Sequence, residues 1–578
     1  MAYPPGQTFN FRNDGIGLSQ NPGTLPLVIG YATGLTPNTL YQSSNPNTFR
    51  DLAGSGPVME TALAAIAKAG GAMVLALTAS TAAVTSAVTA ERVDSSTGDV
   101  TVSGTPTLDY DAKVEITKSG RKGRGRFKYT LDGETYASER VIPQGGTFAV
   151  PGTGLTLSFD GTPANTAVTQ VGSGPVVTRT GVTLGEYQFV IEITTGGAVG
   201  TAVFRWSTDN GVTWTSGVTT AATVVLGTTG NTANFAAGTY VIATTYSWLS
   251  YDSIAGDWEL GDVHSFTTTA PHYTTANLAT AMATLKAQLG KRRVRKVILT
   301  GRQASASAGA TMFAAVASHM ATLEADHQFC RAIMDVGGDD AEDVRTAYSA
   351  ASDDRVGVVF QKARCIVRAA IDGYGNAWMP GVRAVAERVF EADLSENLGR
   401  VASGPMSWVT EIEHNEGTDQ QFVEAEKVIT FRTHDGEDGF FITNGYLKSP
   451  NGSDFLYWDW GIVVDELAEA MLFGQNKFLL SKLRSLVDGT GRLDPNEAIR
   501  IEGAIKGLID ARLRDPVNVE GQKGHVAATS YKIDLTNDYL ATRTVNSTGV
   551  AVPLSPVETF DGEVGLTRST EIAITRSI

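Results

Sequence analysis

The stretch PVMETALAAIAKAGGAMVLAL, residues 57–77, decides the fold class of this chain. It predicts a helix over 57–69, because Pro57 suits a first helical turn and Gly70-Gly71 ends the pattern. Residues 73–77 are a continuous apolar run of strand length, typical of a strand buried on both faces. An apolar strand at 25–30 precedes the helix, so the three elements predict a βαβ unit.

The same alternation returns after Pro271. The sequence predicts helices over 274–289, 305–324 and 340–351, and strands over 294–300, 329–334 and 356–360. Alternating strands and helices indicate a mainly parallel sheet covered by helices. We therefore expect one discontinuous α/β domain built from residues 25–93 and 267–392.

The segment between these two parts is rich in Thr, Val, Gly and Ser, and it repeats itself at an offset of 77 residues. VEIT at 114–117 returns as IEIT at 191–194, and FKY at 127–129 returns as FRW at 204–206. Asp132-Gly133 and Asp209-Asn210 are hairpin-turn signals. We expect an inserted tandem pair of β-sandwich-like repeats, with boundaries at 94–180 and 181–266.

A third region, residues 393–549, mixes strands at 427–432 and 439–443 with two helices. The first helix is predicted over 461–486 and the second over 495–514. Asp494 is a natural N-cap for the second helix, and Glu497 has the spacing of a capping box. The whole chain is thus expected to be an α/β and α+β multidomain protein.

Both ends of the chain resemble extended arms with strand patterning and too few apolar residues to form a core. The predicted arms span residues 1–24 and 550–578. Such segments suit addition to a neighbouring sheet, where five backbone hydrogen bonds supply about 5 kcal/mol. The apolar arm residues are Phe9, Phe11, Ile16, Leu18, Val550, Val552, Leu554, Val564, Leu566, Ile572 and Ile574.

Composition excludes several partners. The 578 residues carry 46 basic and 61 acidic side chains, a net charge of −15, which disfavours direct binding of nucleic acid. No apolar run is long enough to cross a membrane, and no secretory signal begins the chain, so we expect a soluble product without membrane insertion. The two cysteines, Cys330 and Cys365, are predicted to be buried thiols of a protein made in a reducing cytoplasm.

Motifs of catalysis are missing: there is no P-loop, no Gly-x-Ser-x-Gly elbow and no His-Glu-x-x-His. One acidic cluster with a histidine could hold a metal, but a strand running into a solvated loop explains it better; it comprises Glu411, Glu413, His414, Glu416 and Asp419. A second cluster is explained as acidic residues opening a helix; it comprises Asp339, Asp340, Glu342 and Asp343. We predict no catalytic residue, cofactor or metal site.

Two further features lie in the insertion. Residues 118–128 hold six basic side chains that the second repeat mostly lacks, so they serve solubility or a contact with an acidic surface rather than the fold. Residues 207–214, STDNGVTW, match the Ser-x-Asp-x-Gly-x-Thr-Trp box of sialidases. That box marks a hairpin turn and is structural, so it does not predict sialidase activity.

Several segments together resemble contractile phage tail sheath proteins. These segments are GYATG at 30–34, FRDLAGSG at 49–56, MPGVRA at 379–384, NLG at 397–399, DFLYW at 454–458 and DGTGRL at 488–493. The closing strands from Tyr531 to Leu554 add to the resemblance, which covers about 400 residues and leaves out the insertion.

The resemblance implies a virion structural protein of the tail, assembled in the host bacterial cytoplasm. Its subunits would stack as homo-oligomeric, hexameric rings around a tail tube, contact baseplate and tail terminator proteins, and exchange arm strands. Contraction would drive the tube through the host envelope for genome ejection without nucleotide. The C-terminal domain would face the tube through the helix from Pro495, with Glu497, Arg500, Glu502, Lys506, Asp510 and Arg512 as tube-proximal residues.

Two other hypotheses stay open at this point. A virion surface protein or adhesin would use the β repeats to bind a host surface, but this leaves the α/β region unexplained. An enzyme would need convergent polar residues in a pocket at the carboxyl ends of the parallel strands, and the sequence offers no obvious set.

Overall fold

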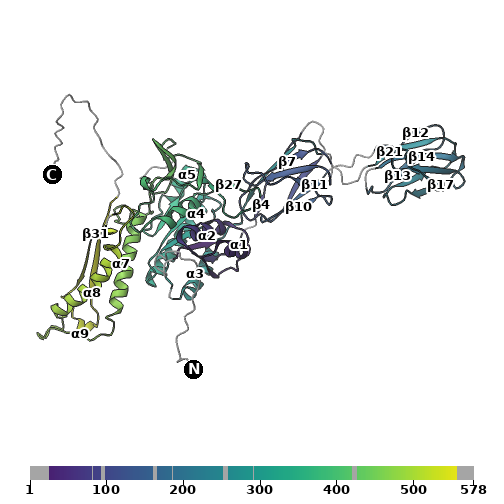
Figure 1. The fold of residues 1–578 in the computed structure, drawn as a ribbon. Coiled ribbons are helices and arrows are strands. Elements are labelled where there is room, and N and C mark those ends of the chain that lie inside the picture. Colours follow the sequence, from purple (N-terminus) through teal and green to yellow (C-terminus); the bar gives the residue numbers. More distant parts are fainter. Residues whose placement is uncertain are drawn as a thin grey trace, which may run out of the picture.

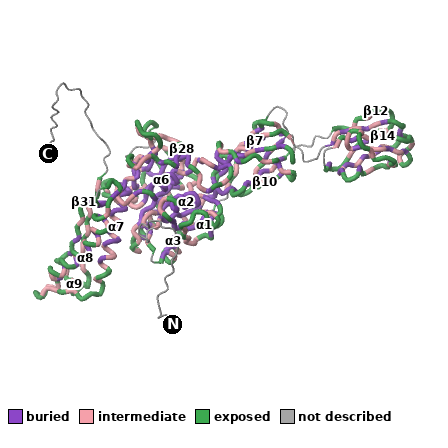
Figure 2. The backbone as a smooth tube through the Cα atoms, viewed as in Figure 1, coloured by how far each residue is buried: buried purple, intermediate pink, exposed green. Residues whose placement is uncertain are grey.

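The computed structural model describes residues 25–80, 83–92, 98–120, 122–160, 166–184, 187–250, 258–290, 292–419, 426–521 and 523–555. The molecule is elongated, with a helix-covered core flanked by a helical module on one side and two β domains in line on the other (Figure 1). Buried residues concentrate in that core (Figure 2).

A six-stranded sheet organises the core, in the order β2-β3-β1-β23-β24-β25. All neighbouring pairs are parallel except β2 with β3. The predicted βαβ unit and mainly parallel sheet are therefore confirmed. The strands are β1 (Leu27–Gly30), β2 (Leu40–Ser43), β3 (Ala72–Ala76), β23 (Lys296–Leu299), β24 (Arg331–Asp335) and β25 (Val356–Val359).

Helices cover both faces of this sheet. Alternate residues of each strand point to opposite faces, so Val28 and Ile298 pack in one cluster with α2 (Pro57–Ala69) and α6 (Gly381–Glu391). Leu27 and Val297 pack in another cluster with the helices of the opposite face. Those helices are α3 (Thr275–Leu289), α4 (Ala306–Ala325) and α5 (Ala341–Tyr348). A short helix, α1 (Pro46–Ala53), precedes α2 and was not predicted.

The inserted β domains are nested, and not in tandem as expected. β22 (Val263–Thr269) returns after the second repeat and pairs with β7 (Asp111–Lys118) of the first, whereas β12 and β13 belong to the second. The predicted boundary at 180 therefore falls inside one domain. The 77-residue offset identifies which strands of the two repeats are equivalent. It cannot show that the strand beside β7 is β22, which lies about 150 residues further along the chain.

We call the two units the proximal and distal domains. The proximal domain contains β4 (Val84–Thr85), β5 (Thr89–Glu91), β6 (Asp99–Gly104), β7, β8 (Arg126–Thr130), β9 (Arg140–Val141), β10 (Thr147–Val150), β11 (Leu155–Asp160) and β22. The distal domain contains β12 (Thr169–Val171), β13 (Val177–Thr180), β14 (Tyr187–Thr195), β15 (Gly197–Ala198), β16 (Val203–Ser207), β17 (Thr215–Thr219), β18 (Thr223–Val225), β19 (Thr232–Phe235), β20 (Thr239–Tyr240) and β21 (Thr245–Ser250). The proximal domain shares a hydrophobic cluster with the core, and the distal domain has a cluster of its own.

The repeat is reproduced at the level of strand register. Glu115 pairs with Lys128 across β7 and β8, and Glu192 pairs with Arg205 across β14 and β16, each residue shifted by 77. Both pairs form ion pairs, at 3.1 Å and 2.5 Å. The repeated sequence thus specifies the same cross-strand contacts twice.

The core also takes in most of the region that was assigned to a separate C-terminal domain. β28 (Val409–Ile412) pairs with β26 (Lys362–Ile366), which also pairs with β27 (Asn376–Pro380). β29 (Phe431–His434) and β30 (Glu437–Ile442) form a hairpin whose Phe431 and Ile442 join the core cluster. The separate module therefore begins near residue 458 and not at 393, because long-range strand pairing crosses the predicted boundary.

This C-terminal module consists of α7 (Trp458–Asn476), α8 (Pro495–Leu513) and a hairpin of β31 (Val526–Ile533) with β32 (Ser547–Pro553). The predicted second helix is confirmed, with Asp494 as its N-cap. The first helix ends ten residues earlier than predicted. Glu497 does not complete a capping box, because its carboxylate binds Arg500 at 2.7 Å.

Candidate functional site

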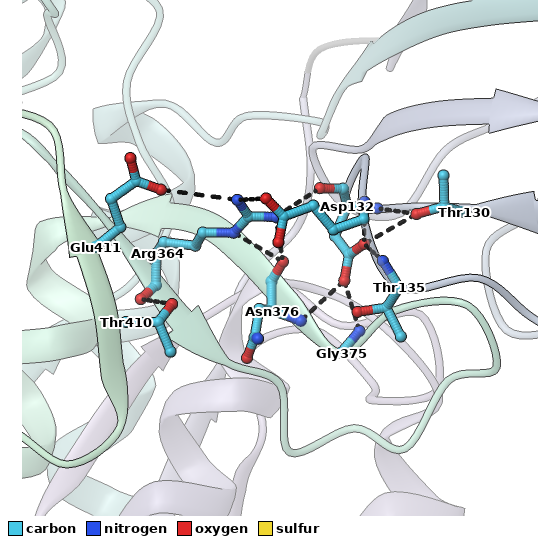
Figure 3. Close-up of polar contacts among 9 residues, drawn as sticks. Thr130, Asp132, Thr135, Arg364, Gly375, Asn376, Thr410 and Glu411 are labelled. Carbon is cyan, nitrogen blue, oxygen red and sulfur yellow. Dashed lines mark hydrogen bonds and ion pairs between the residues drawn. The ribbon is translucent and has the colours of Figure 1, made fainter.

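A polar joint connects the proximal domain to the core (Figure 3). Asp132, in the turn after β8, accepts hydrogen bonds at Oδ1 from the backbone N–H groups of Glu134 and Thr135, at 3.0 Å and 2.7 Å. Its other oxygen, Oδ2, accepts from the N–H groups of Gly375 and Asn376 in the core, at 2.7 Å and 2.8 Å. One buried carboxylate therefore closes its own turn and holds a loop of another domain.

Arg364 of β26 lies on the core side of this joint. Its guanidinium pairs with Glu134 at 2.6 Å and with Glu411 at 3.7 Å, and it donates to the carbonyl of Asp132 at 3.1 Å. Burial opposes ionisation of Asp132, but backbone N–H donors on both sides of the joint outweigh it and lower the pKa of that carboxyl. The joint is thus a satisfied, charged network that fixes the proximal domain on the core.

The distal domain repeats this turn without the joint. Asp209 accepts from the Ser207 hydroxyl at 2.6 Å and from the Thr213 N–H at 2.8 Å. Hydrogen bonds from Ser207 and Thr213 lower the pKa of Asp209 to about 2. The interpretation of residues 207–214 as a structural turn is therefore confirmed. Asp132 is buried and Asp209 is partly exposed, so the same turn docks a loop in one copy only.

The suspected acidic metal cluster is only partly brought together: His414 Nδ1 lies 3.9 Å from Asp419 Oδ2, whereas Glu411 and Glu413 have other partners. The Glu413 carboxylate accepts from the Lys362 N–H at 2.8 Å, the His414 ring stacks on Phe360, and Glu411 belongs to the joint. Across the described ranges, no group of three or more His, Cys, Asp or Glu side chains is placed to hold a metal ion. The favoured explanation, a strand running into a solvated loop, fits these contacts.

The other charged clusters also make structural contacts. Asp340 caps α5 by accepting from Glu342 and Asp343 N–H groups, as predicted for a helix start. Asp339 instead pairs with Arg302 and Lys362. In the basic run, Arg126 pairs with Glu139 at 2.6 Å, and Lys128 with Glu115. Burial raises the pKa of both cysteine thiols to about 12, in keeping with unreactive buried residues.

The six charged residues predicted to face a tube lie on different sides of α8. Glu502 binds Lys532 and the Ile533 N–H of β31, each at 2.9 Å, and Asp510 binds Lys506 and Thr529. Arg512 pairs with Glu466 of α7 at 3.1 Å. Glu497 and Arg500 pair with each other, and the Arg500 side chain is 57% exposed. Arg500 and Lys506 therefore remain the more accessible members of the set.

Sequence reasoning missed an apolar feature at the tip of this module. Leu479, Leu480 and Val487, between α7 and α8, are strongly exposed, and Ile499 in the first turns of α8 is exposed as well. The sequence carries no signal of this exposure, because the predicted helix over 461–486 includes Leu479 and Leu480, whereas α7 ends at Asn476.

The arm predictions divide between described and undescribed residues. Val550 and Val552 lie in β32, half-exposed and paired with β31 of the same chain, and Trp460 donates to the Leu554 carbonyl at 3.0 Å. A C-terminal arm can therefore begin only after β32, unless β32 first separates from β31. Residues Phe9, Phe11, Ile16, Leu18, Val564, Leu566, Ile572 and Ile574 lie outside the described residues.

A buried ionic contact fastens the module to the core. Asp465 of α7 binds Arg331 of β24 at 3.1 Å and Arg355 at 3.0 Å, and the Asp465 and Arg331 side chains are almost completely buried. Arg295 adds an ion pair to Glu469 at 2.7 Å. Sequence analysis noted this helix only for its resemblance and did not predict the contact, because the partners lie more than 100 residues apart.

Comparison with known families gives a match over most of the chain. The model described as "DUF2586, N-terminal domain" matches residues 5–446. The chain belongs to the DUF2586 family. The matched DUF2586 region contains the core sheet and both β domains and ends shortly before α7. Comparison with curated proteins found no match.

Solved structures similar to this DUF2586 chain include a sheath tail protein from Listeria innocua. It is 7% identical, the alignment covers 93% of this chain and 96% of that one, and the TM-score is 0.39. Two others come from the baseplate of the anti-feeding prophage. One is a chain of the 6-fold symmetrised baseplate, which is 12% identical; the alignment covers 52% of this chain and 76% of that one, and the TM-score is 0.35. The other is a chain of the baseplate in its contracted state, which is 13% identical; the alignment covers 51% of this chain and 76% of that one, and the TM-score is 0.35.

No helix among the described residues of this DUF2586 protein is long and apolar enough to cross a membrane. The prominent charged sites are contacts between parts of the chain: the Asp132 joint and the Asp465 contact. Each of these two carboxylates is held by several donors from more than one part of the chain, which is a contact that fixes those parts together.

Proposed function

We propose that this chain is the structural subunit of a contractile tail sheath, which polymerises around a tail tube and contracts to drive the tube through a cell envelope. The residues of the core and of the C-terminal module that resemble sheath proteins support this proposal, as does the chain's division into domains linked by polar joints. Ring stacking, a tube partner, baseplate and terminator contacts, and a place in the virion are parts of the proposal.

The observation that carries it is the hairpin of β31 and β32. Within the described residues this sheet has two strands, so both of its edges lack a paired strand, while one of its faces packs on α7 and α8 through Tyr531 and Ile533. Val550 and Val552 on β32 are half-exposed. Strands donated by the terminal arms of neighbouring subunits would extend this sheet and bury that surface.

The test is electron microscopy of three purified forms of the protein. The full chain should form hollow, ribbed cylinders of uniform width. Deleting residues 1–24 should leave a folded monomer that forms none. The matched control deletes the distal domain, residues 161–257, and joins the ends with a short Gly-Ser linker, because the rings of Phe159 and Trp258 lie only 5.8 Å apart.

The control should form cylinders as the full chain does, with a thinner outer layer. Cylinders from the form without 1–24 would refute the role of the N-terminal arm. Single particles from the full chain, together with glycan binding that is lost when the distal domain is removed, would favour the alternative function, a surface or adhesin protein. That alternative is suggested by the place of the distal domain at the far end of the molecule (Figure 1).

A further inference from the structure

The distal domain, at the far end of the molecule (Figure 1), has two ends of different character. Its first and last described residues meet at one end, where the Leu249 N–H donates to the Thr166 hydroxyl at 2.8 Å. Strands β12 and β21 run side by side from there to the opposite end, where Val171 pairs with Thr245. We call that opposite end the distal tip. It consists of three loops, at 171–176, 196–202 and 236–244.

The distal tip exposes aliphatic side chains. Four of them are 44–65% exposed: Val171, Val176, Val241 and Ile242. They come from two loops that touch, since a Cβ on Gly174 would lie 3.6 Å from the Val241 nitrogen. The third loop joins them through the pairing of Gly197 with Tyr240. Single exposed apolar side chains are ordinary, but four at one end of a small domain indicate a contact surface.

The distal tip also carries no charge. None of its residues is Asp, Glu, Lys, Arg or His, although 19% of the chain is charged. The charged residues nearest to it in sequence are Arg179, Glu192 and Arg205, and the last two pair with each other at 2.5 Å. A charged partner surface would find no counter-charge at the tip, which favours an uncharged occupant.

The loop at 171–176 pairs its backbone carbonyls inside the domain. Four consecutive carbonyls, of residues 173 to 176, each accept a hydrogen bond from the domain. The donors, in order, are the Thr244 hydroxyl at 2.8 Å, the Gln170 amide at 3.1 Å, the Tyr246 hydroxyl at 2.6 Å and the Ala236 N–H at 3.2 Å. A loop that faces water needs no such donors, because water supplies them. A carbonyl carried into hydrocarbon, in contrast, must be paired within the protein.

The small size of the distal tip favours a bilayer over a protein partner. A specific protein interface takes about 20–30 residues from each side, whereas the tip offers four exposed aliphatic side chains. A bilayer sets no such minimum, because each apolar atom that leaves water contributes to binding.

We infer that the distal tip inserts into the apolar region of a lipid bilayer, with Val171, Val176, Val241 and Ile242 entering the hydrocarbon. Only the ends of loops enter, so this insertion needs no segment long enough to cross the membrane. Binding is to acyl chains and not to a particular headgroup. The distal domain lies outside the residues that resemble sheath proteins, so the inference does not rest on the proposed function and either can fail alone.

The test is flotation of the full chain with phosphatidylcholine vesicles in a density gradient, which separates bound protein from any polymer that sediments. Binding should be reversible and no tighter than that of a single myristoyl chain, about 10⁴ M⁻¹, so lipid is titrated into the millimolar range. Vesicles with about one third phosphatidylglycerol should bind no more tightly, because the tip is uncharged and the chain carries a net charge of −15. Absence of binding to phosphatidylcholine, or binding more than about tenfold tighter to the anionic vesicles, would overturn the inference.

Variants place the effect at the distal tip. Ile242→Asp puts a charge where the bilayer would be and should weaken binding at least about tenfold. Val212→Asp makes a matched change at an exposed valine in the turn at the opposite end of the domain, and should bind as the unaltered chain does. Leu480→Asp, in the other exposed apolar group of the chain, should also leave binding unchanged. Loss of binding in either control, or none in Ile242→Asp, would overturn the assignment.

A fluorophore reports the depth of insertion. Cys330 and Cys365 are buried, so Ser173→Cys can be labelled with an environment-sensitive dye at the distal tip alone. Its emission should shift to the blue on phosphatidylcholine vesicles and be quenched by nitroxides on the acyl chains, whereas a label on Val212→Cys should show neither effect. An unquenched label at residue 173 would refute insertion. Self-association that Ile242→Asp abolishes, without vesicle binding, would refute it as well and assign the tip to a second copy of the chain.

Discussion

Replacing Asp132 by Ala tests whether the joint in Figure 3 fixes the proximal domain on the core. The substitution removes the acceptor of the Gly375 and Asn376 N–H groups, which lie 2.7 Å and 2.8 Å from Oδ2. Each hydrogen bond to a charged group contributes about 1.5–3 kcal/mol, so the free energy of local opening should fall by about 3 kcal/mol or more. Amide hydrogen exchange at residues 373–376 should then accelerate by about 100-fold.

The internal repeat provides the matched control. Asp209→Ala removes the equivalent carboxylate from the distal turn, which closes its own turn without a core loop. It should speed exchange within residues 207–214 and leave 373–376 unchanged. Hydrogen exchange with mass spectrometry at pH 7 measures both segments in one experiment.

Unchanged exchange at 373–376 in Asp132→Ala would refute the role of this carboxylate at the joint. The pH dependence is a second check. The pKa of Asp132 is lower in the folded protein than its ordinary value of 3.8. The carboxylate therefore contributes its full share to the stability of the folded state above pH 3.8, and this stabilisation is lost as the pH falls through the pKa of the folded protein. The joint should therefore keep its protection at pH 5.

Three further predictions concern the C-terminal module. Burial raises the pKa of Asp459 to about 7, so the stability of the protein should fall as the pH rises from about 4 to 7. Asp459→Asn should abolish that fall in thermal unfolding, and an unchanged pH profile would contradict the assignment to Asp459. Asp465→Ala leaves Arg331 and Arg355 without their shared partner and should lower the stability of the module by about 3–5 kcal/mol, which faster proteolysis of α7 would report. A loss of stability below about 1 kcal/mol would argue against the contact. Gly461→Ala places a Cβ against the buried Arg331 side chain and should lower the melting temperature. Its control, Gly503→Ala on α8, adds a Cβ in open space and should raise the free energy of unfolding by up to about 1 kcal/mol. A similar response of both variants would contradict the close packing of Gly461 on Arg331.

Local patterns in the sequence were sufficient for most of the core elements. The helix at 57–69 was predicted at its observed bounds, because Pro57 and Gly70 mark its ends chemically. The buried strands at 73–77 and 356–360 follow from continuous apolar runs, which are typical of parallel strands covered on both faces. The repeat of 77 residues also predicted equivalent strands, and the ion pairs of Glu115 and Glu192 occupy equivalent positions.

Pairing between distant segments was decided by the tertiary structure alone. Nothing local in 263–269 shows that it completes the sheet of the proximal domain, and nothing in 409–412 shows that it pairs with β26, so the boundaries at 180 and 393 were misplaced. The sites have the same origin. Asp132 meets Gly375, and Asp465 meets Arg331, only because folding brings together residues more than 100 positions apart, whereas sequence patterns report neighbours within a helix turn or a hairpin.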